Sequence, residues 1–113
     1  MTALSQPQLR MRQTIGGYTF EGPYMTPDLV PQSPAVYAIV CSDQRNYYLL
    51  DVGYSADARR AVKRSPRRRC WEANTRGALM YSFLVDGQLD EAGYRALEKE
   101  IRGKYPQVPC GQR

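Results

Sequence analysis

Seven basic residues fall within eleven positions in the middle of this 113-residue chain. They make up nearly half of its 16 Lys and Arg residues, and the formal net charge is +5. Cations gathered this closely repel one another, and their focused positive field attracts polyanions more strongly than scattered charge does. Contact with a phosphate backbone is therefore the first chemistry that this basic segment, Arg59–Arg69, predicts.

Histidine is absent from the sequence. This absence excludes Ser-His-Asp and Cys-His nucleophilic sites, most zinc enzymes, and nucleases that use a histidine base. Any catalysis would have to use Tyr, Glu, Asp, Arg, Lys or a bound metal. Asp51, near the end of an apolar run, is either a second carboxylate close to a metal or a structural acceptor paired with an arginine, and the structural role is favoured.

Two short apolar runs, Val36–Cys41 and Tyr47–Val52, precede the basic segment. Both are rich in β-branched and aromatic residues, and the turn-like residues 42–46 between them predict an antiparallel hairpin. Because both runs are almost continuously apolar, we expect the sheet to be covered on both faces. Ser55 is the predicted N-cap of a helix that begins near Ala56 and ends before Pro66.

The remaining elements complete an α+β fold: a small antiparallel sheet of three main strands, in the order β-β-α-β-α, flanked by helices. An extra N-terminal edge strand is possible at Tyr18–Phe20. The other predicted elements are a short helical turn at Cys70–Asn74, a third strand at Ala78–Val85 and a last helix at about Asp90–Lys104.

The chain length suits one domain, residues 18–113, preceded by a flexible N-terminal arm, residues 1–17. The sequence shows no apolar run long enough to span a bilayer and no secretory signal. Three widely spaced cysteines argue against a disulfide framework and a zinc knuckle, so Cys70 is expected to be a small buried apolar residue. A cytoplasmic location and no membrane partner are the resulting predictions.

The stretch from Pro34 to Gly111 resembles the GIY-YIG nuclease superfamily. Ala35-Val36-Tyr37 stands where that family has Gly-Ile/Val-Tyr, and Asp51-Val52-Gly53 stands where it has Tyr-Ile/Val-Gly. Ala92–Tyr105 resembles the last helix of the family, with Glu98 at the position of its metal-binding glutamate. More narrowly, the chain resembles a small, little-characterised branch, whose motifs here are Leu49–Gly53, Arg67–Trp71 and Pro109–Gly111.

This resemblance implies hydrolysis of phosphodiester bonds in nucleic acid, with DNA favoured over RNA. Glu98 would hold a single Mg²⁺ or Mn²⁺ ion, and Tyr37 would orient or activate water. The arginine of the family corresponds to Ala61, so the phosphate would be met by Arg64 or Arg60, which flank that position. The alternative is a catalytically inactive module on the same fold that binds nucleic acid or another protein.

Several residues are expected to contact nucleic acid without taking part in catalysis. A glycine lets a backbone approach the substrate closely, and a tyrosine just after it could line the cleft. A homodimer or a targeting partner could add specificity. The predicted contact residues are Gly53, Tyr54, Arg59, Lys63, Arg67, Arg68 and Arg69. For Tyr37 and Glu98, the alternatives are a packing tyrosine and a helix glutamate paired with Arg95 or Arg102.

Overall fold

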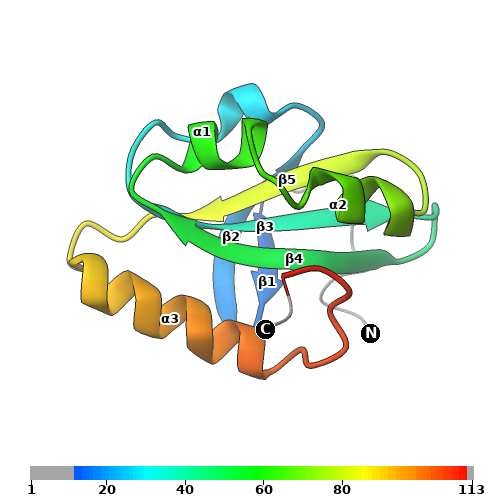
Figure 1. The fold of residues 1–113 in the computed structure, drawn as a ribbon. Helices are drawn as coiled ribbons and strands as arrows, with labels where there is room; N and C mark the ends of the chain where they lie inside the picture. Colours follow the sequence, from blue (N-terminus) through cyan, green and yellow to red (C-terminus); the bar gives the residue numbers. More distant parts are fainter. Residues whose placement is uncertain (1–11, 112–113) are drawn as a thin grey trace.

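A computed structural model describes residues 12–111, which form a curled, antiparallel five-stranded sheet with helices on both faces (Figure 1). The strands are β1 (Arg12–Ile15), β2 (Tyr18–Tyr24), β3 (Ala35–Ser42), β4 (Tyr47–Ser55) and β5 (Leu79–Leu84). The helices are the short η2 (Pro27–Leu29), α1 (Ala58–Lys63), α2 (Arg68–Asn74) and α3 (Glu91–Gly103). The strand order across the sheet is β1-β2-β5-β3-β4.

The sheet separates two apolar cores. On one face α3 covers a core that includes Val36, Val52 and Ile101, and on the other face α1 and α2 cover a core that includes Ile39 and Trp71. Neighbouring residues of a strand point to opposite faces, so a nearly continuous apolar run fills both cores. The predicted β3–β4 hairpin and the covering of both its faces are confirmed.

The expectation of three main strands is wrong, because β1 and β2 add two more. Tyr18–Phe20 begins β2, which lies inside the sheet between β1 and β5. The prediction of a flexible arm over residues 1–17 is wrong for residues 12–17: Arg12–Ile15 form β1, and Gly16 and Gly17, with φ of +61° and +89°, form the turn of the β1–β2 hairpin. Gly-Gly favours a two-residue hairpin turn because both residues accept positive φ. Residues 1–11 of the predicted arm lie outside the described residues.

Helix α1 begins two residues later than expected, and Asp57, not Ser55, is its N-cap. The Asp57 side chain accepts a hydrogen bond from Arg60 N at 3.2 Å. Ser55 Oγ instead accepts from Asp57 N at 3.0 Å, which shapes the turn before the helix. Both residue types favour N-caps, so composition alone did not separate them.

Helix α3 lies where the sequence predicts it. Asp90 caps it by accepting a hydrogen bond from Gly93 N at 2.8 Å, and its apolar face buries Tyr94, Leu97 and Ile101. Glu98 lies at the border of this buried face, with only 16% of its side chain exposed. Helix α3 packs mainly against β4, which is an edge strand of the sheet.

The C-terminal segment, residues 105–111, folds back from α3 to the edge of β4 (Figure 1). Its Cys110 N donates to Leu50 O at 3.1 Å, and a disulfide joins Cys110 to Cys70 of α2. The expectation of no disulfide, with Cys70 as a buried apolar residue, is therefore wrong. The odd cysteine count hid the bond because Cys41 stays free and buried, and 40 residues separate the bonded pair.

The disulfide removes the argument from cysteine usage for a reducing compartment, since such bonds persist mainly in oxidising ones. Within residues 12–111, every helix is too short or too polar to cross a bilayer. The cytoplasmic location stays a prediction.

Ile101→Ala tests the core beneath α3. Ile101 is fully buried, and we expect its truncation to lower the free energy of unfolding by about 3 kcal/mol, because it removes transfer free energy and leaves a cavity. Urea unfolding measures the loss. The matched control on the exposed face of the same helix, Lys99→Ala, should change stability by about 0.5 kcal/mol or less. Equal midpoints for the two variants would contradict this packing.

Candidate functional site

The carboxylate of Asp51 is the centre of a buried polar cluster at the β4 edge. Its side chain is fully buried, and Oδ2 accepts a hydrogen bond from Trp71 Nε1 at 2.8 Å. Arg67 Nε lies 3.1 Å from Oδ2, and Arg102 Nη2 donates to Oδ1 at 3.0 Å. A buried carboxylate without such partners would be very costly, so these three donors are what allow it to stay inside. The structural role expected for Asp51 is confirmed.

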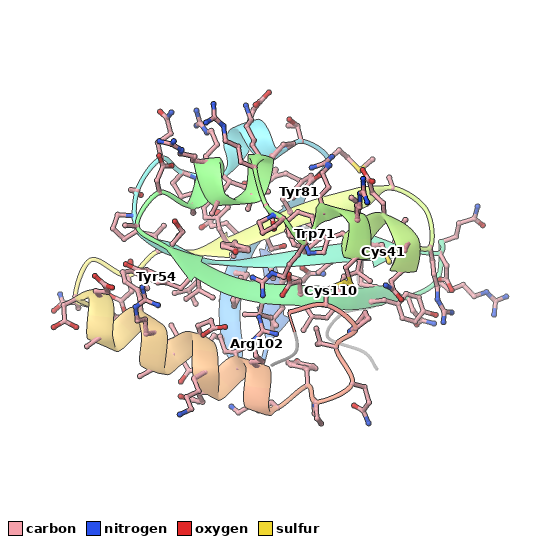
Figure 2. The ribbon with its side chains drawn as sticks, in the orientation of Figure 1. Cys41, Tyr54, Trp71, Tyr81, Arg102 and Cys110 are labelled. Carbon is pink, nitrogen blue, oxygen red and sulfur yellow. A yellow bond between two sulfur atoms is a disulfide. The ribbon has the colours of Figure 1, made fainter. Side chains whose placement is uncertain are left out.

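The cluster draws on both faces of the sheet because it lies at an edge. Asp51 pairs with Ile39 and Gly53 pairs with Tyr37 across the hairpin, which places Tyr37 and Asp51 on the face covered by α2. Arg102 rises from α3, on the opposite face, and reaches past β4 to the same carboxylate (Figure 2). An interior strand would have blocked this contact. We call Tyr37, Asp51, Arg67, Trp71, Glu98 and Arg102 the Asp51 cluster.

Arg102 connects four acceptor residues through its guanidinium. Besides Asp51, it donates from Nε to Glu98 Oε2 at 3.0 Å and from Nη1 to the carbonyls of Cys110 and Gly111 at 3.3 and 3.0 Å. The pairing of Glu98 with Arg102, one helical turn away, is one of the alternatives drawn from the sequence. The two arginines and two carboxylates leave the Asp51 cluster with no net formal charge.

The hydroxyl of Tyr37 faces this cluster. Arg67 Nη2 donates to Tyr37 OH at 3.4 Å, and only 5% of the residue is exposed. Burial raises the pKa of the Tyr37 hydroxyl, the nearby charge of Arg67 lowers it, and Asp51 and Glu98 raise it. Because the pKa lies above its usual value, the phenol is protonated at neutral pH and can donate a hydrogen bond but does not act as a base.

Gly53 is required by the packing of Tyr37. A Cβ at position 53 would lie 2.9 Å from Tyr37 Cε1, so any larger residue would displace the ring. Tyr54, in contrast, lies on the α3 face, where it stacks on Tyr94 with ring centroids 5.3 Å apart and lies beneath the guanidinium of Arg95. The predicted contact residues Gly53 and Tyr54 therefore face opposite sides of β4.

The structure brings Tyr37 and Glu98 to one cluster, but the arginines beside them are Arg67 and Arg102. The predicted phosphate ligands of the catalytic set lie elsewhere: Arg60 is on α1 and Arg64 is its C-cap. There they line an open hollow of about 470 Å³, which we call the α1 hollow. Its lining residues are Gln32, Asp57, Arg59, Arg60, Lys63 and Arg64.

The seven cations of the basic segment divide into two groups. Four have partners: Arg59 Nε donates to Val30 O, Lys63 pairs with Asp28, Arg67 with Asp51, and Arg68 with Glu72. Lys63 lowers the pKa of the Asp28 carboxyl through this pairing. The other three, Arg60, Arg64 and Arg69, are exposed and form no ion pair with any residue from 12 to 111.

The residues of the cluster fit an arginine–carboxylate network better than a divalent metal. Both oxygens of Asp51 are used by positively charged or N–H donors, and a cation at Glu98 would lie beside the Arg102 guanidinium. In the described part of the chain, His, Cys, Asp and Glu side chains form no group of three that could hold a metal. Mg²⁺ or Mn²⁺ at Glu98 stays a prediction from the family resemblance.

The contacts of Arg102 with Asp51 and with the two carbonyls of the C-terminal segment were not predicted from the sequence. The spacing of Glu98 and Arg102 signals only their mutual pairing. Asp51 lies 51 residues from Arg102, and no local pattern reports a contact at that distance. The basic composition near Arg67 did predict a function for this residue. The prediction was contact with nucleic acid, whereas in the structure Arg67 and Trp71 bind the Asp51 carboxylate.

Asp51→Asn tests the network. An amide cannot balance two guanidiniums, so we expect the free energy of unfolding to fall by about 3–5 kcal/mol in urea. Glu91→Gln is the control: its exposed pair with Arg95, on the same helix as Arg102, should be worth about 1 kcal/mol or less. If Asp51→Asn costs no more than Glu91→Gln, the buried carboxylate is not the centre of this network.

Tyr37→Phe tests the raised pKa of the hydroxyl. The folded state holds this proton above pH 10, where the unfolded chain releases it, so the stability contribution is complete below about pH 10 and is lost as pH rises further. We expect the free energy of unfolding of the wild type to fall more steeply above pH 10 than that of the variant. Parallel slopes in alkaline urea titrations would show that Tyr37 is not shifted.

Comparison of the chain with protein-family models, curated proteins and solved structures gives no match. The resemblance to GIY-YIG nucleases consequently depends on short sequence motifs and on the order of the expected elements.

Proposed function

We propose that the chain is a nucleic-acid-binding domain related to the GIY-YIG nucleases, which contacts the phosphate backbone through the outer face of α1. The observation that carries this proposal is the set of exposed cations without ion-pair partners in the described structure: Arg60 and Arg64 at the α1 hollow, and Arg69 on α2. Guanidiniums without ion-pair partners form strong, charge-assisted hydrogen bonds to phosphate oxygens.

The repulsion between the two guanidiniums at the α1 hollow also supports nucleic-acid binding. Arg60 lies in the last turn of α1 and Arg64 is its C-cap, so the two cations lie at the same end of the helix and line the same α1 hollow. Like charges held this close repel each other. The opposite side of α1 buries Ala58 and Val62 against the sheet. The two guanidiniums therefore point outward from a fixed support, and a polyanion would relieve their repulsion by displacing counterions.

Arg60→Gln combined with Arg64→Gln tests this surface. We expect weaker binding of a labelled DNA duplex, and a plot of log affinity against log salt whose slope is less steep by about 1.8, because two phosphate contacts are lost. Fluorescence anisotropy at several salt concentrations measures both. The control, Arg95→Gln, removes an exposed arginine of α3 that already pairs with Glu91 and should leave binding unchanged.

The same assay distinguishes the partners. Competition by duplex DNA, single-stranded DNA, RNA and heparin should show preference for a nucleic acid, with DNA favoured over RNA. Equal competition by heparin would favour the alternative of a basic face that binds an acidic protein. Unchanged binding by the double variant would place the interface elsewhere. Whether binding needs a second copy of the chain or a targeting partner is tested by the stoichiometry of the complex.

Phosphodiester cleavage is the second candidate, because the Tyr37 hydroxyl, Glu98 and two guanidiniums belong to one cluster. We expect binding without cleavage, since the phenol is protonated and Glu98 is occupied by Arg102. Incubation of supercoiled DNA with Mg²⁺ or Mn²⁺ should leave it intact. Nicking that disappears in both Glu98→Gln and Tyr37→Phe would overturn this expectation and assign those residues to catalysis.

A further inference from the structure

The C-terminal segment occupies hydrogen-bond donors that suit an anion. Arg102 Nη1 donates to the carbonyl oxygens of Cys110 at 3.3 Å and Gly111 at 3.0 Å. Each of these acceptors is a neutral backbone oxygen, and a phosphate oxygen in the same place would make a shorter and stronger, charge-assisted bond. The segment thus fills a position that a phosphate group could take.

Gly111 lies directly against the Asp51 carboxylate and its two guanidiniums. Its backbone φ is +77°, and a Cβ built at this residue would collide with Asp51 Oδ1 and lie 2.5 Å from Arg67 Nη1 and 2.8 Å from Arg102 Nη1. Only a residue without a side chain can pass so close to this carboxylate and both arginines. Arg67 is also the first arginine of the run that continues to the exposed Arg69, so a ligand at this position would lie next to the basic segment.

The disulfide holds the segment in this position. Cys70 lies on α2, three residues after Arg67, and its bond to Cys110 fixes the residue just before Gly111 (Figure 2). The other contacts that tie residues 109–111 to the domain include Cys110 N to Leu50 O and the two carbonyls on Arg102. Individual hydrogen bonds contribute little net stability, so the covalent bond is the strongest restraint on this segment.

We infer that the C-terminal segment is a thiol-controlled cover over a second phosphate-binding position formed by Arg67 and Arg102. A dithiol reductant donates two electrons and two protons to the Cys70–Cys110 bond, yielding two thiols and a disulfide in the reductant. The released segment leaves the carbonyl positions on Arg102, and a phosphate group of bound nucleic acid replaces them. This inference extends the proposed function, since it adds a regulated contact beside the basic segment.

Two measurements on the full chain test the cover. The first is made without nucleic acid, and the second is made with a labelled oligonucleotide. Hydrogen–deuterium exchange of residues 105–111 should accelerate on addition of dithiothreitol, while α3 stays protected. Anisotropy with a labelled oligonucleotide should show an affinity about fivefold higher after reduction, the size expected of one partly exposed charge pair. Mass spectrometry of alkylated thiols confirms that the bond has been reduced.

Three variants separate the contributions of the disulfide, the C-terminal segment and Arg102 to the affinity for nucleic acid. The double variant Cys70→Ser with Cys110→Ser should bind the oligonucleotide with the affinity of the reduced wild type, and dithiothreitol should not change that affinity. Gly111→Ala, which leaves the cysteines intact, should raise affinity before reduction because its methyl group would collide with both guanidiniums. Arg102→Gln should bind like the oxidised wild type in both thiol states, since the added contact is missing.

The outcomes are distinct for the two proposals. If exchange of residues 105–111 does not change on reduction, the cover is wrong whatever the chain binds. If exchange accelerates but affinity stays the same, the proposal of a phosphate-binding position beneath the cover is wrong, while the proposal of binding at α1 is unaffected. If neither thiol state binds any oligonucleotide, the proposed function fails, and with it the assignment of a nucleic-acid phosphate to this position.

Discussion

The Asp51 carboxylate is buried at the edge of the sheet, and it can remain there only because two guanidiniums and an indole N–H surround it. These donors come from α2 and α3, which cover opposite faces of the sheet. One side chain on β4 therefore fixes both helices relative to the same strand. The C-terminal segment is added to this arrangement through Arg102 and through the disulfide to α2.

This arrangement divides the arginines of the chain by their roles. Arg67 and Arg102 are used to balance Asp51 and Glu98, so they contribute no net charge to the surface in the closed structure. Arg60 lies on α1 and Arg64 caps it, the other face of this helix is buried, and both arginines stay available to an anion. Composition alone would have counted all four equally. The fold explains why a run of cations can be partly structural and still present a binding surface.

The parts of the structure that could be predicted are those with a local signal. The β3–β4 hairpin and α3 follow from apolar patterns and caps within single segments. The β1–β2 hairpin was missed because a four-residue strand in a polar stretch leaves a weak pattern, even though Gly16-Gly17 is a turn signal. The contacts of Asp51 with Arg102 and of Cys70 with Cys110 join residues 51 and 40 positions apart, and a single sequence contains no pattern that reports them.

Trp71 is the one tryptophan of the chain, so its indole N–H gives a single, assignable resonance. The most direct test of the buried carboxylate is the rate at which this proton exchanges with deuterium in the folded protein. A fully buried indole that donates to Asp51 at 2.8 Å should exchange only when the domain opens, far more slowly than a free indole. Exchange at the rate of a solvent-exposed tryptophan would show that Asp51 does not hold α2 against β4, and the account built on that contact would fail.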